Sequence, residues 1–219
     1  MADNPLIEIA DVIRLAPVAD PRGRLTGGHP LLDRYVDLEK IADSSMMRAL
    51  LIAAYPRIRE SVLPTALDGG CCLLADGSLV IEPHCCGDLG DLSSWESMAA
   101  LGAQSGPLTA PEPEWRKFWI GHPALLAKPH GERLWLAIHD EAADNGLPCP
   151  GEPIWIVRRA DLATAASAAR RIVTGLWACV DQALDGLIDD DLHDLAVDWI
   201  LNGEGSYQTT AAARQSSKT

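Results

Sequence analysis

An Asp-Gly pair between two apolar runs constrains the fold of this chain more than any other sequence feature. The pair is Asp76-Gly77, preceded by the run 71–75 and followed by the run 78–82. Two such residues between apolar runs are the strongest short-range signal for a β-hairpin, because the tight turn needs residues that tolerate a positive φ. A regular hairpin with this turn pairs Ala75 with Ser78 and Cys71 with Glu82.

Further strands are expected on both sides of the hairpin. The segment 6–15 is β-branched and partly alternating, which indicates a first strand or a short amphipathic segment. Three later runs, at 115–121, 133–139 and 154–158, are separated by loops rich in Gly and Pro at 122–131 and 140–153. Together with the hairpin they predict an antiparallel sheet of four to six strands.

Helical periodicity precedes and follows these strands. The first helix is expected to begin at Asp37 and to end near Ala54, because Pro56 follows. A short helix is expected at 92–101, with Ser93 or Ser94 as its N-cap. A long helix of about seven turns should run from Asp161 to Leu187, and a last helix is expected at 191–201. This order predicts an α+β fold, with the helices packed mainly on one face of the sheet and long C-terminal helices.

The length of 219 residues fits one domain, expected over residues 1–205, with a polar flexible tail at 206–219. The first residues lack a basic stretch followed by an apolar core, and no apolar run reaches the length of a membrane span. We therefore expect a cytoplasmic protein whose cysteines are free thiols.

The net charge of −13 bears on the class of partner. Binding to nucleic acid depends on Lys and Arg that meet phosphates, and anionic membranes select the same residues. We therefore expect neither nucleic acid nor membrane as a partner. A basic protein partner is compatible with the charge, because complementary potentials steer the encounter.

The negative charge is concentrated near the C-terminal end. From Ile172 to Ala213 there is no Lys or Arg, while the same span holds eight Asp or Glu. One interpretation is a solvated helix face. The other is a docking surface for a basic partner, whose contact candidates are Asp185, Asp189, Asp190, Asp191, Asp194 and Asp198.

Cysteine and histidine gather near the hairpin, as Cys71, Cys72, His84, Cys85 and Cys86. Zinc binds thiolates and imidazoles, but adjacent cysteines match the usual ligand spacing poorly. Small buried thiols are the alternative interpretation. Catalysis by a cysteine is a third, although adjacent side chains such as His84 and Cys85 point to opposite faces of an extended chain.

Two shorter motifs have a structural and a functional interpretation. Asp88 and Asp91 could hold a hard cation, but they also suit a turn and a helix cap. His122 could act as an acid–base group, or it could bond a backbone group at a strand end. No phosphate-binding loop and no Gly-x-Ser-x-Gly nucleophile motif is present in the sequence, so no cofactor and no metal is expected.

The middle of the chain, at about 35–190, resembles bacterial proteins of the SMI1/KNR4 (SUKH-like) type. The resemblance depends on Leu63-Pro64, Asp68-Gly69-Gly70, the hairpin, and the strands around Trp119 and Trp135. Many proteins of that type are immunity proteins against toxins, so the resemblance implies a protein that neutralises an effector. The motif from His84 to Trp95 and the Trp-Ile-Gly-His-Pro stretch are more typical of an uncharacterised bacterial family.

Three hypotheses follow. The first is a cytosolic binding protein, of an immunity or antitoxin-like kind, that blocks a basic effector by occlusion. The second is a small metal- or cysteine-dependent enzyme centred on His84, Cys86 and His122. The third is a structural subunit of a larger complex.

Overall fold

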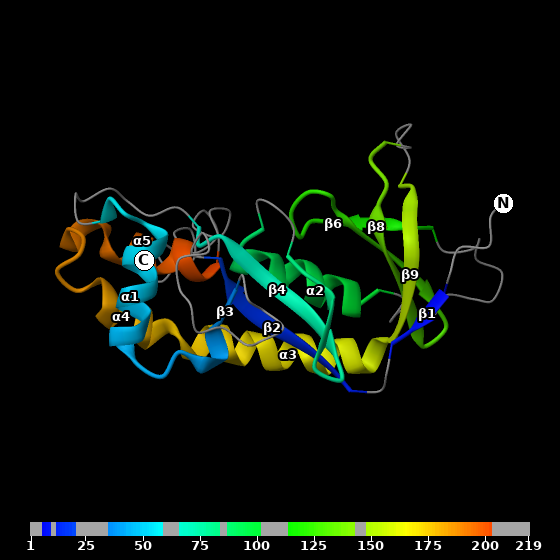
Figure 1. Ribbon diagram of the computed structural model, residues 1–219, viewed down its shortest axis with the longest axis horizontal. Helices are drawn as coiled ribbons and strands as arrows, with labels where there is room; N and C mark the ends of the chain where they lie inside the picture. The colour runs from blue at the N-terminus through cyan, green and yellow to red at the C-terminus, as the bar shows by residue number, and fades with distance from the viewer. Residues whose placement is uncertain are drawn as a thin grey trace, which may run out of the picture. The chain divides into compact units, whose positions relative to one another are not determined.

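The structure is a computed structural model, and it has the mixed α+β architecture that the sequence predicts (Figure 1). It describes residues 6–9, 12–20, 35–58, 66–83, 87–101, 114–142 and 148–202. The described strands form a five-stranded and a four-stranded sheet. The chain divides into two compact units. Unit 1 comprises residues 1–15, 72–87 and 91–169, and unit 2 comprises residues 16–71, 88–90 and 170–219.

The five-stranded sheet belongs to unit 1 and contains most of the predicted strands. Its order is β1 (Leu6–Glu8), β9 (Pro150–Arg158), β8 (Arg133–His139), β7 (Leu125–His130) and β6 (Arg116–Phe118). Neighbouring strands are antiparallel except β1 and β9, which are parallel. The helix α2 (Leu92–Ala99) packs against β6. It begins at Leu92, so the prediction of Ser93 or Ser94 as its N-cap is wrong.

The sequence did not predict strand β7, because its residues fall in the stretch 122–131, where prolines at 123 and 129 and a glycine at 131 indicate a loop. In the structure β7 pairs with β8 over six positions. Its first three residues, Leu125, Leu126 and Ala127, are fully buried. A short apolar run next to proline is ambiguous from sequence alone, and burial against the neighbouring strands decides it.

The four-stranded sheet has the order β3 (Val36–Asp37), β2 (Ile13–Ala19), β4 (Gly69–Ala75) and β5 (Ser78–Ile81). The Asp76-Gly77 hairpin is confirmed, with φ of 49° and 76° at the two turn residues and Ala75 opposite Ser78. The register then shifts, so that Leu73 lies opposite Ile81. The predicted regular pairing is therefore wrong beyond Leu74, because a β-bulge inserts one extra residue into β5.

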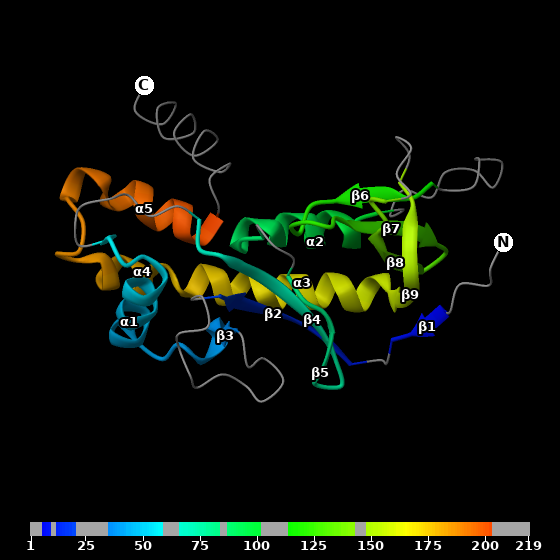
Figure 2. The same cartoon turned by 45° about the horizontal axis from the view of Figure 1, so that its top comes forward.

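The helices α1 (Ser44–Ala54), α4 (Trp177–Leu184) and α5 (Asp190–Asn202) lie in unit 2, where α1 packs on α4 and α4 packs on α5 (Figures 1 and 2). Apolar side chains from all three are buried, among them Leu50, Val180 and Ile200. The predicted start of α1 at Asp37 is wrong. The helix begins at Ser44, seven residues after Asp37, and the Asp43 side chain caps it by accepting a hydrogen bond from the Met46 amide at 2.9 Å.

The long helix expected from Asp161 to Leu187 is two helices. The first, α3, spans Arg159–Gly175, and α4 begins at Trp177 after a turn at Leu176. The last predicted helix is confirmed, since α5 covers the predicted range and one residue more at each end. No helix among the described residues is both long and apolar enough to cross a membrane. The predicted tail at 206–219 lies outside the described residues.

Candidate partner-binding surface

The acidic segment of unit 2 consists of the end of α4, the turn that follows it and the first half of α5. Gly186 has a φ of 64° in this turn, and the Leu187 amide donates to the Leu184 carbonyl at 2.8 Å. A glycine in the left-handed region is the usual way to end a helix, because it carries no Cβ. The turn therefore places Asp185, at the end of α4, near the first turn of α5.

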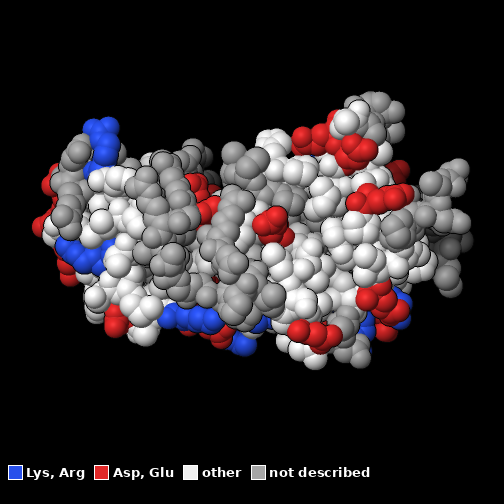
Figure 3. All heavy atoms as spheres, in the orientation of Figure 1, with Lys and Arg blue, Asp and Glu red and all other residues white. Residues whose placement is uncertain are grey.

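Five of the six predicted contact residues are exposed. We call them the acidic surface, and it consists of Asp185, Asp189, Asp190, Asp191 and Asp194. On a helix with 3.6 residues per turn, the three members that belong to α5 fall within about 100° of arc. Figure 3 shows acidic side chains at the margin where Figure 1 places α4 and α5.

The sixth predicted contact residue, Asp198, is not part of this surface. Only 6% of it is exposed, and its Oδ1 accepts a hydrogen bond from Asn202 Nδ2 at 2.9 Å. The sequence could not separate it from the others, because Asp190, Asp194 and Asp198 repeat at the four-residue spacing of one helix face. Packing over the second half of α5 buries that face, and Asp198 has an internal hydrogen-bonding role there.

A histidine joins α5 to α4 behind the acidic surface. His193 Nδ1 lies 3.6 Å from Asp181 Oδ1, and its Nε2 lies 3.7 Å from Asp185 Oδ1. Its Nε2 also lies 3.1 Å from the Asp181 carbonyl oxygen. The side chain of His193 is 17% exposed, so it holds the two helices together rather than extending from the surface.

An arginine from α1 binds the C-terminal end of α4. Arg48 Nη1 donates to the carbonyl oxygens of Ala183 at 2.9 Å and of Asp185 at 2.8 Å. Carbonyl groups in the last turn of a helix lack intrahelical donors, and a guanidinium there also meets the negative end of the helix dipole. Arg48 thus fixes the backbone of Asp185 without forming an ion pair with its carboxylate.

A second acidic group lies elsewhere in unit 2, around Tyr55. Burial raises the pKa of Tyr55 far above its ordinary value, and the carboxylates of Asp68 and Asp88 raise this pKa further. Asp68 and Asp88 form an isolated β-bridge, and Asp88 Oδ1 accepts a hydrogen bond from the Gly90 amide at 2.7 Å. This supports the interpretation of the Asp88 motif as a turn. Asp91 is buried and makes no side-chain cap at α2.

The alternative centre at His84, Cys86 and His122 is only partly described. His84, Cys85 and Cys86 lie outside the described residues, and Cys71 and Cys72 are buried. Within the part of the chain that the structure describes, no group of three His, Cys, Asp or Glu could hold a metal ion.

His122 and the buried His139 have different contacts. The His122 ring meets Trp119 edge to face at 4.5 Å between ring centres. His139 is buried, and its Nδ1 lies 3.2 Å from the Cys149 carbonyl oxygen. The His139 ring contacts the backbone of Cys149. His139, at the end of β8, therefore has the backbone contact expected of a histidine at a strand end.

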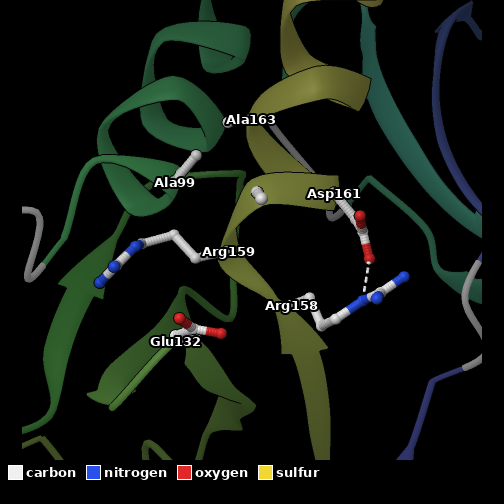
Figure 4. Close-up of a pocket in the computed structure, with 7 residues that line it drawn as sticks. Ala99, Glu132, Arg158, Arg159, Asp161 and Ala163 are labelled. Carbon is white, nitrogen blue, oxygen red and sulfur yellow. Dashed lines mark hydrogen bonds and ion pairs between the residues drawn. The ribbon is translucent and has the colours of Figure 1, made fainter.

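A pocket in unit 1 was not predicted from the sequence (Figure 4). It lies where β9 passes into α3, beside the end of α2 and the turn between β7 and β8. Five of the seven residues that line it lie between Arg158 and Ala163, whereas Ala99 and Glu132 are far from them in the sequence, and the set matches no recognisable motif. Only the tertiary structure brings them together.

Comparison with known proteins adds no relative: no family model, no curated protein and no solved structure matches this chain. The resemblance to the SMI1/KNR4 type therefore stays a prediction.

Proposed function

We propose that this protein is a binding protein that occludes a basic partner through its acidic surface. The observation that carries the proposal is the exposure of five aspartates between residues 185 and 194, inside a stretch from Ile172 to Ala213 without Lys or Arg. Like charges on neighbouring helix positions repel one another in the free protein. A cationic surface relieves this repulsion and is steered towards the site by the local potential.

The local contacts support a rigid docking surface. Arg48 and His193 fix the backbone and the helix pair behind the aspartates, so the carboxylates are presented by ordered elements. Part of the acidic charge has a second role, because Asp190 and Asp191 occupy the first turn of α5, where a carboxylate stabilises the helix. Asp189 precedes Asp190 at the N-cap position, so the same explanation applies to it, whereas Asp185 and Asp194 lie outside this first turn. The SMI1/KNR4 resemblance implies that the basic partner is an effector, which this protein would neutralise by binding it.

The proposal is tested by removing charge from the acidic surface without changing side-chain shape. In the variant Asp189→Asn/Asp191→Asn/Asp194→Asn we expect the affinity for a labelled oligolysine peptide to fall by about tenfold or more, because each lost contact between charges contributes roughly 0.5 kcal/mol. Binding is measured by fluorescence anisotropy at low salt. Capture from a lysate of the native cell, followed by mass spectrometry, should show loss of the same partner.

A matched control changes the net charge equally at another place. Glu114, Glu141 and Glu152 are exposed members of unit 1, and their replacement by Gln also removes three negative charges. This control should bind the peptide and the captured partner much as the original protein does. Equal affinities of the two triple variants would show that only net charge matters, and would exclude the acidic surface as the docking site.

A further inference from the structure

The pocket of unit 1 has the size of a small-molecule site. Its volume is about 420 Å³, and small-molecule pockets fall at roughly 300–1,000 Å³. Alanines form part of its wall, and four charged side chains also line it (Figure 4). The lining residues are Ala99, Glu132, Arg158, Arg159, Ala160, Asp161 and Ala163.

Two of the four charged side chains neutralise each other. Arg158 Nε donates to Asp161 Oδ2 at 2.6 Å, three residues later in the chain. Figure 4 shows this pair on the opposite side of the α3 start from the Arg159 side chain. The charges that this pair leaves in the pocket wall are the guanidinium of Arg159 and the carboxylate of Glu132.

Arg159 is anchored at one nitrogen only. Its Nη1 donates to the Leu101 carbonyl at 3.1 Å and, more weakly, to the Gly131 carbonyl at 3.4 Å. The edge formed by Nε and Nη2 makes no hydrogen bond or ion pair with another described residue. This edge of a guanidinium matches the two oxygens of a carboxylate, and its orientation is already fixed by the anchored nitrogen.

Glu132 supplies the opposite charge. Its carbonyl oxygen accepts the Arg159 amide hydrogen at 2.9 Å, which fixes the β7–β8 turn against the start of α3. Its side chain is exposed and forms no ion pair within the described part of the chain. The pocket therefore presents one cation and one carboxylate that do not pair with each other.

We propose that this pocket binds a small zwitterion of the α-amino acid class. The ligand carboxylate would take the Nε–Nη2 edge of Arg159, and its ammonium group would meet the carboxylate of Glu132. A simple anion would leave Glu132 unpaired beside it, and a simple amine would leave Arg159 unpaired. The alanine lining provides room for the rest of a small ligand. This site lies in unit 1 and is independent of the acidic surface in unit 2.

The first test compares ligands that carry a single charge with ligands that carry both a positive and a negative charge. Thermal-shift and calorimetric titrations of the full chain would use the common amino acids, with propionate, ethylamine and inorganic phosphate as single-charge probes. At least one amino acid should bind, with an affinity about tenfold or more above that of propionate and ethylamine. No binding by any amino acid would overturn the proposal. Stronger binding of phosphate than of every amino acid would also overturn it, and would indicate a simple anion site.

The second test places the ligand in this pocket. Ala163→Leu fills the pocket from an exposed position of α3 and removes no hydrogen bond of Arg159. Binding should be lost in this variant and kept in Ala178→Leu, a matched change at an exposed position of α4. Glu132→Gln should weaken binding about tenfold, while Glu141→Gln should leave it unchanged. Unaltered binding in Ala163→Leu and Glu132→Gln would overturn the proposal.

Discussion

At the scale of single residues, Gly69 shows how the fold restricts the sequence. Its φ is 149°, and a Cβ at this position would lie 2.1 Å from the Val18 carbonyl oxygen. The Asp-Gly-Gly motif thus marks a close approach between β4 and β2 at this point. The neighbouring glycine, Gly70, has a φ of 131°. The motif that suggested a family resemblance therefore has a local structural explanation.

We expect Gly69→Ala to destabilise the protein by roughly 2–5 kcal/mol, because overpacking adds to backbone strain. The midpoint of urea unfolding measures the change. Gly175→Ala is the matched control, since no atom lies within 4 Å of a Cβ added there and its φ is not positive. That control should be neutral, or more stable by up to about 1 kcal/mol. Similar midpoints for the two variants would contradict the steric explanation.

At the scale of secondary-structure elements, Arg48 connects α1 to the end of α4. We expect Arg48→Met to destabilise the protein by about 1.5–3 kcal/mol, because the two carbonyl oxygens of Ala183 and Asp185 lose a charged donor. Urea unfolding monitored by far-UV circular dichroism measures this effect. Arg171 is exposed, so Arg171→Met should change stability by less than about 0.5 kcal/mol. Equal losses in both variants would show that the contact is not stabilising.

The elements themselves were predictable to different degrees. The β4–β5 hairpin, β8 and α5 have strong local signals, and the structure confirms them. The start of α1, the break before α4 and the whole of β7 were mispredicted. In each of these cases the local sequence is compatible with two conformations. The choice between them depends on a cap, a turn or a neighbouring strand, which the local sequence does not specify.

At the scale of the whole molecule, the segregation of charge has a consequence for stability. The net charge is −13, and two like charges about 8 Å apart in water repel by about 0.5 kcal/mol. Added NaCl screens this repulsion over about 8–10 Å. We therefore expect the free energy of unfolding to rise by about 1 kcal/mol between 10 and 150 mM NaCl, as urea titrations at both salt concentrations would measure.

The acidic-surface variant Asp189→Asn/Asp191→Asn/Asp194→Asn should show a smaller rise with NaCl than the Glu114/Glu141/Glu152 control. This difference is expected because Asp189, Asp191 and Asp194 lie within six consecutive residues beside further aspartates, whereas Glu114 belongs to a different segment from Glu141 and Glu152. A stability that falls as NaCl is added would contradict the argument for self-repulsion.

The α+β class, the hairpin turn and the concentration of negative charge before the C-terminal end could be predicted from the sequence, because they follow from local periodicity, turn chemistry and residue counts. The folded protein was needed to see that Asp198 is buried while Asp190 and Asp194, at the same four-residue spacing, are exposed. It was also needed to see that Arg159 and Glu132 share one pocket. Burial and proximity arise from packing between segments distant in the chain, and a local pattern contains no information about which distant segment will cover it.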